Sequence, residues 1–321
     1  MVFVTGCPAP RDDVLQRAAD SYDDRTTTTI VTRPDGEGSM FRIGAHVSIA
    51  SGFPNAVDRE LELGGNCGQL FVGSPRGWAT NEVDGEEATA FREASEANDV
   101  GPWIVHGTYL INLATPKDDL AEKSVDAVQA EIVAADALGI PYYVFHPGAH
   151  TGAGEETGLE NVGERLSALE IPGDVTVLLE NTAGRGTTVG THPADLATMV
   201  DASDHGYGAG GLGVCLDTCH LYAAVYDFTD ESGMDDLVEE VESTVGVEHV
   251  RYLHINDSKH PLGSEKDEHE HVGEGEIGEA GFRQFVNHEA LRGKPMVLET
   301  PEDGKGYAWN VEKVRELRTG D

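Results

Sequence analysis

The chain has 321 residues, with 58 acidic side chains, 22 basic ones and a formal net charge of -36. This length can bury a large core, and no apolar run approaches the ~20 residues that span a bilayer, which excludes a membrane protein. The N-terminal stretch lacks the basic start of a signal peptide, and four cysteines are too few for a disulfide framework, so we expect a cytoplasmic protein.

The acidic side chains are spread along the chain, in pairs such as Asp118-Asp119 and Glu239-Glu240. Two interpretations compete: an enzyme that acts on a cationic or neutral small molecule, or a surface adapted to a salt-rich, halophilic cytoplasm. The wide spread favours adaptation over a local binding surface. The charge by itself argues against a nucleic-acid partner, because such proteins usually carry a basic patch.

Residues 1–39 differ in composition from the rest of the chain. They combine charged residues, a run of four threonines and a Pro-Asp-Gly turn sequence, and they show little apolar periodicity. We interpret them as a weakly ordered N-terminal extension, and residues 40–321 as the folded domain. An added structural element at the N-terminus is the alternative that stays open.

From Phe41 onward, short apolar runs alternate with amphipathic segments. The runs predict eight strands, at residues 41–47, 67–72, 103–107, 142–148, 176–182, 213–220, 251–257 and 296–300. The segments between them predict helices at residues 86–99, 118–139, 158–170, 192–202, 235–245, 280–291 and 310–318. Such alternation forms parallel βαβ units, and eight strands in about 280 residues fit an α/β fold of the (β/α)8 TIM-barrel type. An open, doubly wound sheet is the alternative, because periodicity does not show closure.

Seven of the eight predicted strands end in histidine or an acidic residue. These residues are His46, His106, His146, Glu180, Asp217 with His220, His254 and Glu299. In a parallel barrel all these ends lie on one face, where the active sites of such enzymes are found. No Lys or Arg stands next to them in sequence, so the group would repel itself without bound cations. The sequence therefore predicts more than one metal ion, since the ligands outnumber the four of a tetrahedral zinc site.

The loop KDEHEHVGEGEIG, residues 266–278, adds Asp267 and His269, which could close together on one ion. A solvated run of charges is the alternative, and we favour ligands because the loop follows a ligand-bearing strand and contains turn-forming glycines. Imidazoles mixed with carboxylates suit zinc, manganese or iron better than calcium or magnesium. Two or three such ions, which activate water and hold phosphate oxygens, indicate phosphoryl chemistry.

Cys215 and Cys219 flank Asp217 in CLDTCH, and a strand over 213–220 would turn all three side chains to one side. We interpret both thiols as small buried packing residues and not as metal ligands. No Ser or Cys lies in a nucleophile elbow, so the sequence gives no sign of covalent catalysis.

Seven motifs resemble the endonuclease IV family of apurinic/apyrimidinic DNA endonucleases, from Phe41 to about Arg318. They are IGAHVSIASG, HGTYLINLATP, FHPGAH, LLENTAG, GVCLDTCH, LHINDSK and VGEGEIG. The resemblance implies a (β/α)8 barrel with three zinc ions at its C-terminal face. The ligands that it implies are His106, His146 and Glu180 for the first ion, Glu180, Asp217, His254 and Glu299 for the second, and His220, Asp267 and His269 for the third. His46 then lies near the ions without binding one.

The resemblance also implies contacts to DNA. Members of the family insert an arginine and a tyrosine into the duplex at the lesion, and Arg76 in SPRGW and Tyr109 in HGTYLINL match these residues. An abasic site has already lost one base, so a wedge there costs little unstacking. Glu268 and Glu270 stand where the family carries basic or neutral residues, which argues against DNA contacts at that loop.

The activity implied by the resemblance is zinc-dependent repair of double-stranded DNA by a monomer, with Glu180 as the catalytic residue. The enzyme would cleave the phosphodiester 5′ to an abasic site, leave a 3′-hydroxyl and a 5′-deoxyribose phosphate, and remove 3′-blocking groups. One alternative is a metal-dependent sugar isomerase or epimerase, which would not need His220, Asp267 and His269. Another is a metal-binding or scaffolding protein without activity. For a halophilic enzyme we expect activity that persists towards molar KCl.

Overall fold

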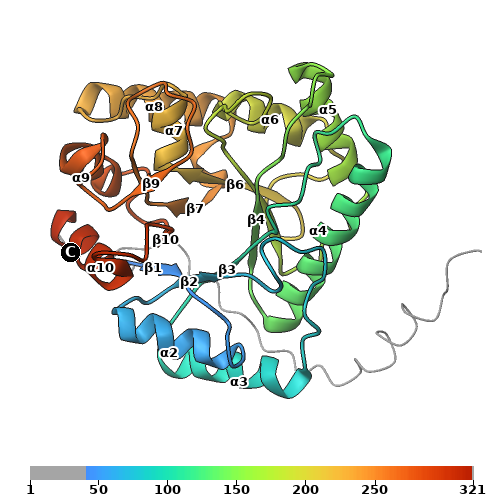
Figure 1. The fold of residues 1–321 in the computed structure, drawn as a ribbon, viewed down its shortest axis with the longest axis horizontal. Coiled ribbons are helices and arrows are strands. Elements are labelled where there is room, and N and C mark those ends of the chain that lie inside the picture. The colour runs from blue at the N-terminus through green and yellow to red at the C-terminus, as the bar shows by residue number, and fades with distance from the viewer. Residues whose placement is uncertain (1–40, 320–321) are drawn as a thin grey trace, which may run out of the picture. The chain divides into compact units, whose positions relative to one another are not determined.

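The computed structural model describes residues 41–319. Within this range eight parallel strands close into a barrel, and the connecting helices lie around its outside (Figure 1). The predicted (β/α)8 barrel is therefore confirmed, and the open doubly wound sheet is wrong. The extension predicted for residues 1–39 lies outside the described residues.

The strands pair in the order β1-β10-β7-β6-β5-β4-β3-β2, and pairing of β1 with β2 closes the barrel. Their bounds are β1 (Ile43–His46), β2 (Gly68–Leu70), β3 (Trp103–His106), β4 (Tyr142–Phe145), β5 (Thr176–Glu180), β6 (Leu212–Asp217), β7 (Val250–His254) and β10 (Met296–Leu298). Each strand is shorter than the apolar run that predicted it, because the ends of the run belong to the segments that flank the strand.

The interior of the barrel is a small packed core. It consists of seven fully buried residues, Cys67, Ile104, Val144, Leu178, Cys215, Tyr252 and Val297. The residues next to them in sequence, such as Val105 and Tyr143, belong to the larger core between the strands and the helices. This period-two alternation is what a strand with two buried faces requires, and it fills the barrel with side chains.

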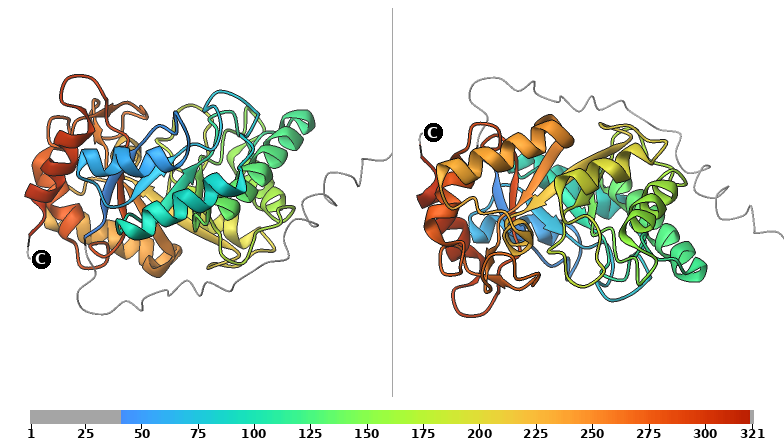
Figure 2. Two further views of the ribbon diagram at one scale, coloured as in Figure 1. Left: turned by 90° about the horizontal axis from the view of Figure 1, so that it is seen from below. Right: turned by 90° about the horizontal axis from the view of Figure 1, so that it is seen from above.

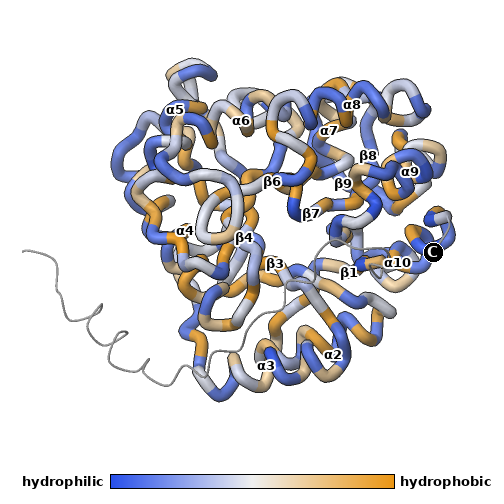
Figure 3. The backbone as a smooth tube through the Cα atoms, turned by 180° about the vertical axis from the view of Figure 1, so that it is seen from behind, coloured by the Kyte–Doolittle hydropathy of each residue, from blue (hydrophilic) through white to orange (hydrophobic). Residues whose placement is uncertain are grey.

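The helices pack one apolar side against the barrel. Their bounds are α2 (Pro54–Leu63), α3 (Gly85–Ala97), α4 (Asp118–Leu138), α5 (Glu155–Leu166), α6 (Pro193–Asp201), α7 (Thr218–Ala224), α8 (Glu231–Thr244), α9 (Gly278–Asn287) and α10 (Gly306–Leu317). Views from below and above also show strands inside and helices outside (Figure 2). Polar and apolar residues alternate along these helices, as expected when one side is buried (Figure 3). Among the described residues, none of the helices is long and apolar enough to cross a membrane.

The structure corrects the prediction of one strand over 213–220. β6 ends at Asp217, whose carboxylate accepts the His220 N–H at 2.9 Å and so caps α7. His220 therefore lies on a helix, and the alternation argument for Cys219 was wrong. Both Cys215 and Cys219 are buried thiols, as predicted, with Cys215 in the barrel interior. The ligand atoms of Cys219, Asp217 and His269 lie within 4.8 Å of one another, so the prediction that Cys219 binds no metal ion stays a prediction.

Helix α2 and the hairpin of β8 and β9 were also missed in the sequence. Helix α2 begins with Pro54 and ends at Gly64, which adopts the left-handed conformation that often closes helices. A two-stranded antiparallel hairpin joins β8 (Asp257–Ser258) to β9 (His269–Glu270), beside the C-terminal end of β7. This hairpin belongs to the loop that carries Asp267 and His269.

Candidate metal centre

Each residue of the barrel interior is followed, two positions later, by a polar residue of the site. Ile104, for example, precedes His106, and Cys215 precedes Asp217. Side chains two apart on a strand face the same way, so the interior face continues as a polar group at the C-terminal ends of the strands. A cavity of about 480 Å³ opens at this end, and its lining combines strand-end residues with Tyr109, His220, Asp267 and His269 from the segments that follow the strands.

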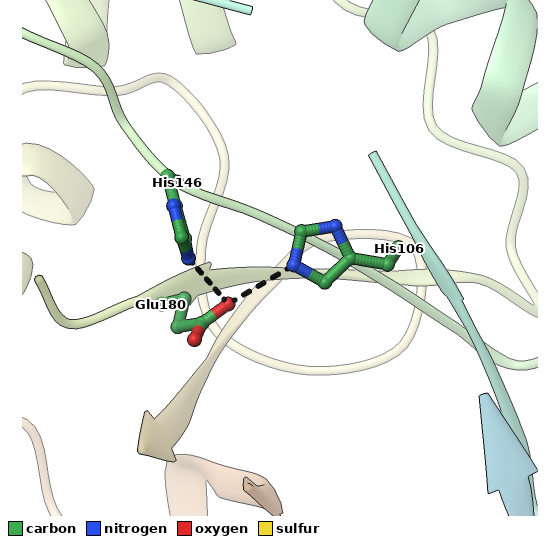
Figure 4. A group of neighbouring side chains, drawn as sticks. All are labelled: His106, His146 and Glu180. Atoms are coloured by element: carbon green, nitrogen blue, oxygen red, sulfur yellow. Dashed lines mark ion pairs between the residues drawn. The ribbon is translucent and has the colours of Figure 1, made fainter. Parts of the chain in front are cut away.

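The first group of side chains comprises His106, His146 and Glu180, from β3, the end of β4 and β5. Oε2 of Glu180 lies between the two imidazoles, 3.4 Å from Nε2 of His106 and 3.2 Å from Nε2 of His146 (Figure 4). This buried oxygen has no hydrogen-bond partner among the described residues. A buried acceptor between two ring nitrogens fits the position of a ligand to a shared cation.

The second group contains Glu180, Asp217, His254 and Glu299, whose ligand atoms lie within 4.8 Å of one another. Nδ1 of His254 is 3.1 Å from Oε1 of Glu180 and 3.5 Å from Oε2 of Glu299. Glu180 thus presents one carboxylate oxygen to each of the first two groups. A carboxylate in this position is able to bridge two ions.

The third group combines His220 on α7 with Asp267 and His269 from the hairpin loop. Oδ1 of Asp267 lies 3.1 Å from Nε2 of His220 and 3.2 Å from Nε2 of His269. Within the described residues the buried Nε2 of His269 has no hydrogen-bond partner. The structure thus brings together all nine residues predicted as metal ligands, in the three sets that the resemblance implies.

The second nitrogen of three of these imidazoles lies at a backbone carbonyl. Nδ1 of His106 is 2.8 Å from the oxygen of Gly107, and Nδ1 of His220 is 2.9 Å from that of Asn181. Nδ1 of His269 is 3.1 Å from the oxygen of Glu299. Such contacts place a proton on Nδ1 and direct Nε2 at the group, so that Nε2 is the nitrogen that would bind a metal ion after losing its own proton.

The protonation of the cluster favours cation binding. Burial raises the pKa of Glu180, but the imidazoles of His146, His254 and His106 outweigh it and hold that pKa well below its usual range. Burial lowers the pKa of His269, whereas Asp267 and Asp217 raise it to about 9. Carboxylates that stay ionised against imidazoles that hold protons form a site in which a metal ion can replace those protons.

Gln69, on β2, is the site residue that sequence reasoning missed. Its fully buried amide donates a hydrogen bond to Oε1 of Glu299 at 2.6 Å, and its Oε1 lies 2.8 Å from Nε2 of His254. Gln69 stands near the end of the second strand, as the ligands stand at the ends of the others, but it has no charge to mark it as a site residue. His46 contacts Gln69 and Glu299, at 2.8 and 3.6 Å, and belongs to none of the three groups.

The two residues predicted to contact DNA lie on neighbouring loops of the same face. Tyr109 is 56% exposed, and its ring packs edge-on against Phe71 and His106. Its backbone N–H donates to the carbonyl of Pro75 at 3.0 Å, and Pro75 directly precedes the exposed Arg76. Tyr109 lines the cavity, so an inserted aromatic ring there would lie beside the metal groups.

Comparison with known proteins agrees with this geometry. The family model described as a xylose isomerase-like TIM barrel matches residues 57–317. The chain is 52% identical over 278 residues to the probable endonuclease 4 of Halobacterium salinarum, which covers 86% of this chain and 99% of that protein. The crystal structure of endonuclease IV from Thermus thermophilus aligns with a TM-score of 0.76 and 36% identity, over 86% of this chain and 98% of that chain. A D-tagatose 3-epimerase-like protein aligns with a TM-score of 0.62 and 17% identity, over 86% of this chain and 96% of that chain, and shares the fold alone.

Proposed function

The chain belongs to the endonuclease IV family, and from this premise we propose that it is a DNA repair endonuclease that cleaves the phosphodiester 5′ to abasic sites in double-stranded DNA. The products would carry a 3′-hydroxyl and a 5′-deoxyribose phosphate, and 3′-blocking groups would be removed at the same site. The active form would be a monomer in the cytoplasm.

The observation that carries the proposal is the presence of three neighbouring ligand groups, each of which contributes residues to the lining of one cavity. A sugar isomerase or epimerase would use one or two ions, and the group of His220, Asp267 and His269 would then have no role. Nitrogen and carboxylate donors suit zinc, and the unpartnered buried atoms of Glu180 and His269 fit ions at these positions. We therefore propose three zinc ions per chain.

The residues of the three groups would divide the work. His106, His146 and Glu180 would hold the first ion, Glu180, Asp217, His254 and Glu299 the second, and His220, Asp267 and His269 the third. Zinc bound there would supply a Lewis acid for phosphate oxygens and would activate water. Glu180 would act as the catalytic residue because one of its oxygens faces the first group and the other faces the second.

Arg76 and Tyr109 would contact the DNA at the lesion. The exposed tyrosine ring at the rim would fill the gap left by the missing base, and the neighbouring arginine would reach the backbone or the opened stack. The adjacent Trp78 is 40% exposed on the Arg76 loop and adds aromatic surface to the same rim.

Incision of a duplex with one abasic site tests the proposal directly. We expect a nick on the 5′ side of the lesion whose 3′ end primes a DNA polymerase, and we expect a zinc chelator to abolish it. An intact duplex of the same sequence is the control. Absence of a nick, or a 3′ end that a polymerase does not extend, would contradict the proposed function.

Substitution Glu180→Gln tests the catalytic role. The neutral amide keeps the shape of the side chain but loses the charge shared by two groups, so the incision rate should fall roughly a thousandfold, or about 4 kcal/mol in barrier height. Glu93→Gln, at an exposed position of α3, is the matched control and should keep the wild-type rate. Incision by the Glu180 variant at the wild-type rate, with the fold intact by circular dichroism, would remove Glu180 from the mechanism.

A further inference from the structure

Asp257, the first residue of β8, is fully buried, and its carboxylate accepts hydrogen bonds from five backbone N–H groups. Oδ1 accepts from Ser258 at 2.8 Å and Ile277 at 3.0 Å, and Oδ2 accepts from Gly273 at 2.9 Å, Gly275 at 3.0 Å and Gly278 at 3.3 Å. Four of the five donors lie at residues 273–278, so the Asp257 side chain holds the end of the loop that begins after β8. A carboxylate with five charge-assisted hydrogen bonds is a strong and directional anchor.

The backbone of this loop approaches Asp257 too closely for any side chain at Gly275. A Cβ atom there would lie 2.4 Å from the carbonyl oxygen of Ser258 and 2.6 Å from Oδ1 of Asp257. Gly273 has a φ of +83°, which lets its N–H turn towards the carboxylate. The glycines of VGEGEIG therefore form an anion-binding turn, and the anion that it binds is the carboxylate of Asp257.

The same anchor is connected to the metal ligands by the hairpin. Ser258, next to Asp257, pairs with His269, and Asp257 pairs with Glu270. The N–H of Glu276 also donates to the carbonyl of Ser258 at 2.8 Å. A shift of the loop end at Asp257 would therefore move His269 and the nearby Asp267 relative to His220.

The third group takes two of its three predicted ligands from this loop, whereas the first two groups take none. Asp267 and His269 lie on the loop, but the predicted ligands of the first and second groups lie at the ends of barrel strands. We propose that Asp257 is a positioning residue for the third group, which holds the loop so that Asp267 and His269 face His220 and bind the third ion. The inference rests on the proposed function, because it takes this group to bind a metal ion.

Asp257→Asn is the test, because it keeps the size of the side chain but turns one acceptor into an N–H donor that faces backbone N–H groups. We expect the variant to bind two zinc ions firmly, and the third ion ten- to a hundredfold more weakly than the wild type. Native mass spectrometry gives the number of ions, and competition with a zinc-chelating dye gives their affinities. Asp230→Asn is the matched control: this exposed carboxylate also accepts a backbone N–H, at the start of α8, and its variant should keep three ions.

Two further variants separate positioning from a general loss of structure. His269→Asn removes a ligand directly and should give the same two-ion state, and the double variant of Asp257 and His269 should bind no fewer ions than His269→Asn alone. Gly275→Ala moves the loop away from an intact Asp257 and should also lose the third ion. If Asp257→Asn does not fold, retention of three ions with wild-type affinity by Gly275→Ala overturns the inference.

Hydrogen exchange on the metal-free proteins gives a readout that does not depend on zinc. We expect Asp257→Asn to speed the exchange of amides in residues 259–278 and to leave those of α4 and α5 unchanged. Unchanged exchange in the loop, or three ions of wild-type affinity in the folded variant, would overturn the role of Asp257. A wild-type protein that binds fewer than three ions would instead contradict the proposed function, and the exchange experiment would still decide the role of Asp257 in holding the loop.

Discussion

In the second group, the two ring nitrogens of His254 have different partners. His254 turns Nδ1 towards the two carboxylates, at 3.1 and 3.5 Å, and turns Nε2 towards Gln69 at 2.8 Å. The amide of Gln69 also donates to Glu299 at 2.6 Å, so one neutral side chain orients two members of the second group. Partners of this kind raise metal affinity because they remove rotational freedom from the ligands before the ion binds.

Substitution Gln69→Met tests whether Gln69 supports metal binding by the second group. Methionine fills a similar volume but makes no hydrogen bond to His254 or Glu299, so zinc affinity at the second group should fall about tenfold. Competition with a chelating dye measures the change. Gln129→Met is the control, because Gln129 hydrogen-bonds with the backbone of Glu170 and lies in none of the three groups, so it should leave zinc affinity unchanged. Equal affinities for all three proteins would show that Gln69 does not support the site.

Sequence reasoning found the ionisable residues of the site because strand ends follow a simple rule. His106, Glu180 and Asp217 each stand two positions after a buried interior residue, and that spacing is visible in the sequence. Gln69 obeys the same spacing but has no charge to mark it. The geometry of the third group was not accessible in this way, since it depends on a helix start at Thr218 and on a loop folded around Asp257.

At the scale of elements, helix α4 supports the loops that carry Arg76 and Tyr109. Its buried Glu131 accepts a hydrogen bond from the hydroxyl of Tyr143 at 2.8 Å and lies 3.3 Å from the N–H of Thr108. The hydroxyl of Thr108 donates in turn to the carbonyl of Pro75 at 3.0 Å, which links the two loops. A polar contact from the buried face of α4 thus fixes the rim of the cavity.

This contact predicts a dependence of stability on pH. Burial outweighs the hydrogen bonds of Glu131 and raises its pKa to about 7, from 4.5 in an exposed chain. The folded protein therefore holds a proton more tightly than the unfolded chain, and the stabilisation present below pH 4.5 is lost as the pH rises through 7. Relative to Glu131→Gln, the wild-type free energy of unfolding should fall by about 3 kcal/mol across this window.

Urea denaturation at several pH values between 4.5 and 8, at constant salt, measures the difference between the two proteins. Glu122→Gln, an exposed position on the same helix, is the control and should follow the wild type at every pH. Parallel curves for the wild type and Glu131→Gln would show that Glu131 does not titrate in this range.

The boundaries of elements show where sequence patterns stop being informative. The run GVCLDTCH is apolar enough to predict one strand over 213–220, but Asp217 caps a helix at its centre, and a capping aspartate is visible only when the chain is known to turn there. Helix α2 was missed because its buried face is small, with Ala56, Val57 and Glu60 as its buried residues. The barrel itself was predictable since each of its eight strands is buried on both faces.

At the scale of the whole molecule, the protein and its proposed substrate, DNA, are both negatively charged. Acidic side chains outnumber basic ones by 36, so one-to-one ion pairing would leave that many carboxylates unpaired. At molar salt, counterion release from basic residues gives little affinity for DNA. Binding would depend on the charge of the bound metal ions, on the inserted Tyr109 and Arg76, and on the ease with which abasic DNA bends.

These charges predict that incision persists or rises as KCl increases towards molar concentrations. The Debye length shrinks from about 10 Å at 0.1 M salt to about 3 Å at 1 M, so salt screens the repulsion between an acidic surface and DNA before it weakens contacts inside the cavity. Incision rates over this range, with KM separated from kcat, measure the effect, and KM should fall or stay constant. Choline chloride at equal ionic strength separates screening from a specific need for potassium, and unfolding measured at each salt concentration separates binding from stability. Loss of activity above a few hundred millimolar KCl in a protein that remains folded would contradict salt adaptation, because such a loss is typical of a nuclease whose binding depends on basic contacts to phosphate.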